Sequence, residues 1–71
     1  MSAEQLVRVV VVDDHPIFRA GLARALCDAA IDVVGEAGSA AEAVRTVAAA
    51  RPDVVLLDIV LPDGRLAVRL P

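Results

Sequence analysis

Short hydrophobic runs alternate along this chain with longer segments in which apolar residues recur every three or four positions. The runs Val9–Val12 and Val54–Leu57 contain no polar residue, which is typical of strands that are buried on both faces of a parallel sheet. We therefore predict strands over residues 8–12 and 53–57. A shorter run, Ile31–Gly35, is predicted to form a further strand between them.

The segment after the first strand has the pattern of an amphipathic helix that ends near Ala30. Pro16 suits the first helical position, where a missing N–H costs nothing. Gly21 lies inside this helix and is expected to pack closely against a neighbour. The face that we expect to be buried comprises Phe18, Leu22, Ala25, Leu26 and Ala29.

A second helix is predicted to begin after Ser39, because Glu42 follows it at the spacing of a capping box. The pair Arg51-Pro52 should end this helix, since the residue before a proline is disfavoured in helical geometry. After the third strand, Leu61–Gly64 predicts a turn, and residues 65–70 are compatible with the start of a third helix. The expected buried face of the second helix comprises Ala40, Ala43, Val44, Val47 and Ala48.

The predicted order of elements, β-α-β-α-β, is the front half of a flavodoxin-like, doubly wound α/β fold with a parallel sheet. Right-handed crossovers would place the first strand between the second and the third, giving the strand order 2-1-3. The carboxyl ends of the first and third strands would then be neighbours. Ligands of such sheets bind outside the carboxyl ends of the strands, at this switch point.

Acidic residues follow directly on both of the long apolar runs. Asp13 and Asp14 come after the first strand, and Asp58 ends the third. Carboxylates held this close repel one another unless a cation compensates them, and oxygen ligands favour a hard ion such as Mg²⁺. An aspartate at the position of Asp58 can act as a nucleophile toward phosphorus, with the backbone carbonyl of Val60 as a further metal ligand.

Other interpretations of these residues remain open at this stage. Acidic residues after strands often cap the following helix, which is a sufficient role for Asp14 alone. Composition and spacing leave a Mg²⁺-dependent phosphatase or hydrolase half-domain, with Asp13 as nucleophile, nearly as well supported as a phospho-acceptor. His15 is better explained as a cap or surface residue than as a metal ligand.

Composition narrows the function further. The net charge is −3, and the seven basic residues, all arginines, are scattered, so nucleic-acid binding by this segment is disfavoured. No apolar stretch is long enough to span a membrane. Cys27 is the single cysteine, which fits a reducing cytoplasm, and we expect it to be a small buried hydrophobe.

The chain resembles the receiver domain of bacterial two-component response regulators, in particular the NarL/FixJ (LuxR-type) branch. The resemblance covers most of the chain from Arg8 to Gly64 and is highly specific in combination. The residues that carry it are Val9-Val10-Val11-Val12-Asp13-Asp14-His15-Pro16-Ile17-Phe18-Arg19-Ala20-Gly21-Leu22, then Val33-Val34-Gly35-Glu36-Ala37-Gly38-Ser39, and Pro52-Asp53-Val54-Val55-Leu56-Leu57-Asp58-Ile59-Val60-Leu61-Pro62.

The resemblance implies a signalling module of the cytoplasm rather than an enzyme. Asp58 would accept a phosphoryl group from a sensor histidine kinase. Asp14 and Asp58 would ligate Mg²⁺ directly, Asp13 would act mainly through bound water, and the carbonyl of Val60 would complete the protein ligands. In the intact protein, a DNA-binding domain that controls transcription would be expected.

The chain also departs from the family. A complete receiver domain has about 120 residues, so residues 1–71 correspond to a partial domain with a core at 8–64 and an irregular tail at 65–71. The two further strands of the family bring a switch Ser or Thr and a Lys, and this sequence contains no Lys. A third strand left as an exposed edge is expected to promote self-association. An inactive fragment that only pairs with other receiver domains is a further hypothesis.

Overall fold

The computed structural model describes residues 6–58 and 66–69, of which Asp58 and residues 66–69 are described by their backbone alone. Two helices and a four-stranded sheet make up this part of the chain. The elements are β1 (Arg8–Asp13), α1 (Pro16–Asp28), β2 (Asp32–Ala37), α2 (Ala40–Ala50), β3 (Val54–Asp58) and β4 (Leu66–Arg69).

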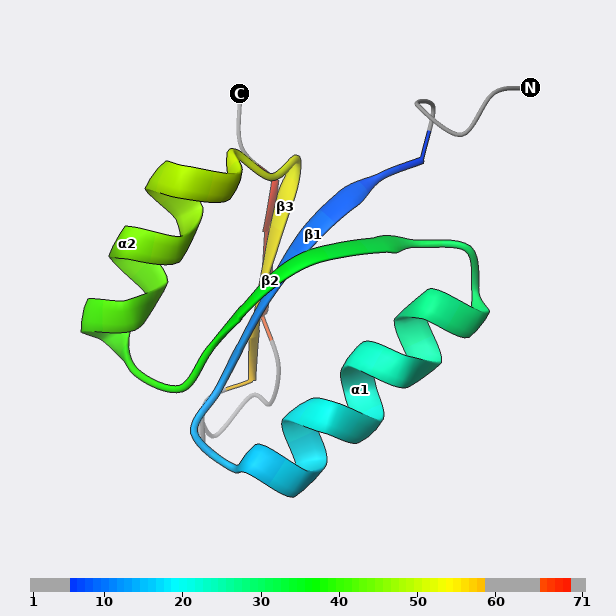
Figure 1. Cartoon of the computed structure of the whole chain (residues 1–71), viewed down its shortest axis with the longest axis horizontal. Helices are drawn as coiled ribbons and strands as arrows, with labels where there is room; N and C mark the ends of the chain where they lie inside the picture. Colours follow the sequence, from blue (N-terminus) through cyan, green and yellow to red (C-terminus); the bar gives the residue numbers. More distant parts are fainter. Residues whose placement is uncertain (1–5, 59–65, 70–71) are drawn as a thin grey trace.

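The strand order is β2-β1-β3-β4, and β1 runs parallel to both β2 and β3. The predicted doubly wound topology and the order 2-1-3 are therefore confirmed. The helices α1 and α2 lie on opposite sides of the sheet, as right-handed crossovers in opposite directions require (Figure 1). Because β1 is central, its two ends are the places where loops from several elements meet.

The tail differs from the prediction. Residues 66–69 do not start a helix but form β4, which pairs antiparallel with β3 from Val54↔Arg69 to Leu57↔Leu66. The edge of β3 offers unpaired backbone N–H and C=O groups, and satisfying them outweighs a short helix that Pro71 would stop. The expectation that this edge of the third strand is exposed is therefore wrong, whereas the expected self-association stays a prediction.

The core lies between the sheet and α2. Val10, Val12, Ala37 and Val55 are buried there, and side chains of α2 pack on them, including Ala43 and Val47. The approach is close at Gly35, where an added Cβ would lie 2.6 Å from Cγ2 of Thr46. Because Gly35 has no side chain, α2 can pack closely against β2 at this point.

The ends of α2 are as predicted, but the face that it buries is rotated about the helix axis relative to the predicted face. Oγ of Ser39 accepts a hydrogen bond from the N–H of Glu42 (3.1 Å), and Arg51 ends the helix in the left-handed conformation. Val44, however, is 72 % exposed, and Ala40 and Ala48 are exposed as well. The residues facing the sheet are Ala43, Thr46, Val47 and Ala50.

The predicted face of α1 is wrong in a similar way. Leu22 and Leu26 are half-buried as expected, but Phe18, Ala25 and Ala29 are exposed. Ala23 is buried in their place, and Arg19 is half-buried beside it. Apolar residues surround so much of this helix that periodicity alone does not define which side meets the sheet.

Two single residues of α1 also depart from expectation. Among the residues that the structure describes, none lies within 4 Å of a Cβ added at Gly21, so close packing against them does not explain this glycine. Cys27 is exposed instead of buried.

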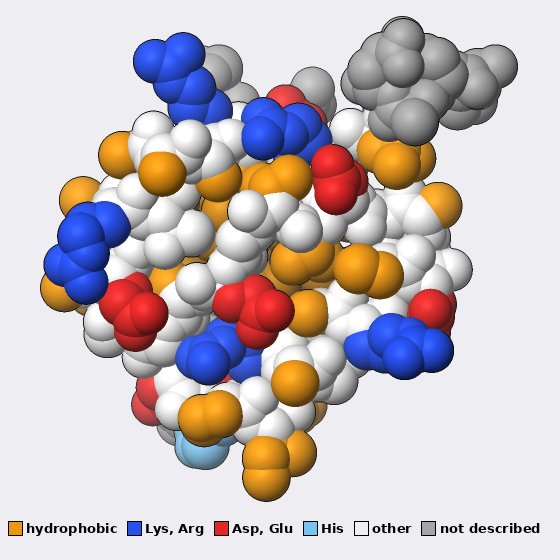
Figure 2. All heavy atoms as spheres, in the orientation of Figure 1, with side chains coloured by type: hydrophobic (Ala, Val, Ile, Leu, Met, Phe, Trp, Pro, Cys, Tyr) orange, Lys and Arg blue, Asp and Glu red, His pale blue; other side chains and the backbone are white. Residues whose placement is uncertain are grey.

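The surface carries mixed charge. On the face drawn in Figure 2, arginine and acidic side chains are interspersed with apolar ones, and neither sign forms a continuous stripe. Within residues 6–58 and 66–69, no helix combines the length and the apolar character needed to cross a bilayer.

Candidate functional site

The carboxyl-terminal edge of the sheet brings together the strand ends that carry the acidic residues. β1 and β3 pair in parallel from Val9↔Val54 to Asp13↔Asp58, so the backbones of Asp13 and Asp58 are direct partners in the register. The prediction that these strands are neighbours and end at the same edge is confirmed. Val60 lies outside the described residues, so its expected role stays a prediction.

Asp13 is the buried member of the acidic group. Its side chain has 0 % exposure, and Oδ1 accepts a hydrogen bond from the backbone N–H of His15 at 2.8 Å. This bond turns the chain from the end of β1 into the start of α1, as aspartate side chains commonly do in turns. Burial of a carboxylate costs free energy unless donors or cations compensate it, which makes this edge a favourable place for a cation.

Asp14 and His15 form the exposed part of the group. Nδ1 of His15 lies 2.9 Å from Oδ1 of Asp14 and 3.5 Å from Oδ1 of Asp13. Both side chains are about two-thirds exposed, at 66 % for Asp14 and 67 % for His15. His15 occupies the N-cap position of α1, as predicted, but its side chain makes no capping hydrogen bond. Asp14 does not cap the helix either, which weakens the purely structural explanation of this residue.

The donor set suits a divalent cation. One ligand atom each of Asp13, Asp14 and His15 lies within 4.8 Å of the others. The carboxylate oxygens are the hard ligands that Mg²⁺ prefers, whereas an imidazole is a poor Mg²⁺ ligand. The residues therefore fit a magnesium site built on the two aspartates, with His15 at its margin.

Arg19 and Glu36 adjoin this site and were missed by the sequence analysis. Nη1 of Arg19 donates to the backbone carbonyl of Asp13 (2.8 Å), and its Nε donates to Oε1 of Glu36 (3.3 Å). In the structure, positions 19, 22, 23 and 26 form the inner face of α1, so Arg19 lies on the side of the helix that meets the sheet. An arginine on such a face must find acceptors, and strand ends offer them.

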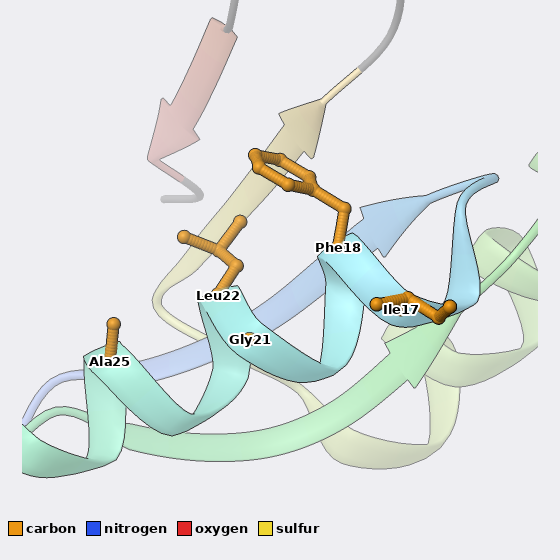
Figure 3. A pocket seen from close by; sticks show the side chains of 5 residues that line it. All are labelled: Ile17, Phe18, Gly21, Leu22 and Ala25. Atoms are coloured by element: carbon orange, nitrogen blue, oxygen red, sulfur yellow. The ribbon is translucent and has the colours of Figure 1, made fainter.

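An apolar hollow lies along α1, beside the acidic group. It is lined by Ile17, Phe18, Gly21, Leu22 and Ala25. Phe18, Leu22 and Ala25 stand along one side of the helix, and Ile17 lies further round it (Figure 3). None of these five lining residues is an acid, a base or a nucleophile, so the hollow itself offers no group for catalysis.

The chain is similar in sequence to known proteins. Residues 9–65 match the family model described as the response regulator receiver domain. The chain is 58 % identical over 60 residues to the DNA-binding transcriptional activator DevR/DosR of Mycobacterium tuberculosis, covering 83 % of this chain and 28 % of that protein. It is 47 % identical over 64 residues to a protein-glutamate methylesterase/protein-glutamine glutaminase of Agrobacterium fabrum, covering 89 % of this chain and 18 % of that enzyme.

A solved structure shows the same fold. The signal receiver domain of the response regulator NarL from Mycobacterium tuberculosis superimposes with a TM-score of 0.70 at 52 % sequence identity. The match covers 80 % of this chain and 47 % of the solved chain. The chain thus spans about half of a solved receiver domain, and under a third of the transcriptional activator.

Proposed function

The chain belongs to the response regulator receiver domain family, and from that premise we propose that it is a phospho-accepting module whose acceptor is Asp58. The observation that carries the proposal is the register of β1 and β3, which pairs Asp13 with Asp58 at the edge where Asp14 also lies. A nucleophilic carboxylate beside two further carboxylates is the arrangement that phosphoryl transfer with a divalent cation needs.

The proposed reaction is transfer from a phosphohistidine of a sensor kinase. A carboxylate oxygen of Asp58 forms a bond to phosphorus while the phosphorus–nitrogen bond breaks, and the histidine nitrogen takes up a proton. When bound, Mg²⁺ would neutralise the negative charge on the phosphoryl oxygens. Asp14 and Asp58 would hold the ion directly, Asp13 through water, and the carbonyl of Val60 would complete the set.

The proposal also includes the output domain to which this module would be joined in the intact protein. Relatives that match this chain include a DNA-binding transcriptional activator and a methylesterase, so receiver domains are joined to output domains of different kinds. The higher identity to DevR/DosR supports a transcriptional output through a DNA-binding domain in the intact protein, in the cytoplasm. In this proposal the chain itself is a switch and not an enzyme.

A phosphatase half-domain with Asp13 as nucleophile fits the structure less well. The side chain of Asp13 has 0 % exposure, and one of its oxygens is engaged with the N–H of His15. A nucleophile needs access to its substrate, whereas a group that helps to hold a cation does not need that access. Asp13 is therefore better assigned to the metal site.

Incubation with acetyl phosphate and Mg²⁺, followed by intact-mass measurement, tests the proposal. We expect the chain to gain one phosphoryl group, and Asp58→Ala to abolish the gain. Asp28→Ala is the matched control, because Asp28 is an exposed aspartate at the other end of α1 and should leave the gain unchanged. A folded chain that gains nothing would instead identify an inactive fragment, and turnover of an aryl phosphate that is lost in Asp13→Asn would support the phosphatase.

A further inference from the structure

We propose that Arg19 is a positioning residue that fixes the path of the backbone through Asp14 and thereby sets the affinity of the site for Mg²⁺. The inference rests on the proposed function and extends it to a residue outside the acidic group. Arg19 itself would not ligate the ion, because a guanidinium carries only N–H donors. It acts through the peptide group that precedes Asp14.

The guanidinium of Arg19 bridges two strands at the carboxyl edge of the sheet. Nη1 donates to the carbonyl of Asp13, at the end of β1, and Nε donates to the carboxylate of Glu36, one residue before the end of β2. The side chain of Arg19 is only 22 % exposed, and its bond to the Asp13 carbonyl is partly buried, so water competes less for this bond than for the bond to Glu36, which is exposed. The planar, fork-shaped guanidinium is suited to holding two acceptors at a fixed angle.

Asp14 is consequently held from both sides. The peptide group before it is fixed by Arg19 at the carbonyl of Asp13, and the peptide group after it is fixed by the Asp13 carboxylate at the N–H of His15. The amide of Arg19 also donates to the carbonyl of His15 (2.8 Å). These bonds limit the backbone torsions of Asp14, an exposed residue whose carboxylate would otherwise sample many directions.

Gly38 belongs to the same arrangement. An added Cβ at Gly38 would lie 2.7 Å from Nη1 of Arg19, the nitrogen that holds the Asp13 carbonyl. The guanidinium is the far end of a flexible side chain, so Gly38→Ala should displace Arg19 while the fold persists. This variant disturbs the positioning without removing the charge.

Charge and positioning predict opposite effects, which makes the proposal testable. Removing a positive charge near a cation site strengthens cation binding if electrostatics dominate. Removing a residue that orients a ligand weakens binding, commonly by about 10-fold or more for outer-shell partners of a metal site. The sign of the change in Arg19→Gln therefore distinguishes the two roles.

The experiment titrates Mg²⁺ by calorimetry into the full chain and three variants. We expect the Kd to rise about 10-fold in Arg19→Gln and to rise, by less, in Gly38→Ala. Arg24→Gln is the matched control, since it removes the same charge from an exposed arginine of the same helix that pairs with Asp28, and it should not weaken binding. In the metal-free chain, amide chemical shifts of Asp14 and His15 should change in Arg19→Gln and Gly38→Ala but not in Arg24→Gln.

Unchanged or tighter Mg²⁺ binding in both Arg19→Gln and Gly38→Ala would overturn the positioning role. If Arg19→Gln fails to fold, Gly38→Ala decides the question. Failure of the proposed function is a distinct result, because the unmodified chain would then bind no Mg²⁺ and take up no phosphoryl group.

Discussion

An arginine and an aspartate stand at each end of β1, but their contacts differ between the two ends. At the amino end, the guanidinium of Arg8 donates to the carbonyls of Ala50 (2.7 Å) and Arg51 (2.8 Å), the last acceptors of α2. The backbone N–H of Arg8 donates to Oδ2 of Asp53 (2.9 Å), whose own N–H donates to the carbonyl of Arg8 (2.8 Å). We call these bonds of Arg8 the clamp. They join the amino end of β1 to Asp53 and to the carbonyl groups at the end of α2, where a positive charge is favourable.

At the carboxyl end, an arginine again holds a backbone carbonyl, but carboxylates predominate around it. Asp13 and Asp14 follow one another there, and Asp58 is aligned with Asp13. Like charges placed close together lower the free energy of unfolding, and such clusters are typical of sites that bind an ion or a ligand. The amino end of β1 thus serves to hold β1, α2 and the start of β3 together, whereas the acidic carboxyl end supports the proposal of a cation site there.

Removing the clamp at the amino end should have the largest effect on folding. Arg8→Ala loses two hydrogen bonds from a charged donor and leaves the carbonyls of Ala50 and Arg51 without that donor, so we expect the free energy of unfolding to fall by about 2 kcal/mol. Chemical denaturation followed by circular dichroism measures the change, with Arg45→Ala, at an exposed position of α2, as the control. A loss no larger than that of Arg45→Ala would show that the clamp does not stabilise the chain.

Neutralising a carboxylate at the other end should affect ligand binding more than folding. Without Mg²⁺, Asp14→Asn is expected to unfold at the same or a slightly higher denaturant concentration than the unmodified chain, because the exposed side chain keeps its shape and loses a charge that neighbouring carboxylates repel. At a Mg²⁺ concentration about ten times Kd, the unmodified chain should gain about 1.4 kcal/mol of stability and Asp14→Asn should gain little.

Chelation with EDTA should remove the gain of the unmodified chain. Equal stabilisation of both proteins by Mg²⁺ would mean that the ion binds elsewhere, and the assignment of the two ends would not hold.

The smallest effect is expected at a position that belongs to neither end. Gly21 lies inside α1 with open space around it, so Gly21→Ala should raise the free energy of unfolding by about 1 kcal/mol at most through helix propensity alone. Mg²⁺ affinity should not change. A destabilised Gly21→Ala would indicate that something packs against this turn of α1.

Much of the fold was predictable because it depends on local patterns and on handedness. The apolar runs before Asp13 and Asp58 predicted neighbouring parallel strands, and Ser39 with Glu42 predicted where α2 begins. The tail was not predictable, since pairing of residues 66–69 with β3 depends on an unoccupied strand edge and not on the local sequence.

The site was predictable only in part. That the backbones of Asp13 and Asp58 meet at one edge was predictable, because it is a property of topology. Arg19 and Glu36 were not found, because their role depends on which side of α1 faces the sheet, and many apolar residues around this helix hide that side. The exposed Val44 on α2 has the same explanation.

Paramagnetic broadening by Mn²⁺, used in place of Mg²⁺, tests the central claim most directly. If the acids at the ends of β1 and β3 share one cation, substoichiometric Mn²⁺ should broaden the amide resonances of Asp13, Asp14 and Asp58 together, while those of Arg8 and Asp53 at the opposite end stay sharp. Broadening at Asp13 and Asp14 that is undiminished in Asp58→Ala, or broadening centred on the amino end of β1, would contradict the account.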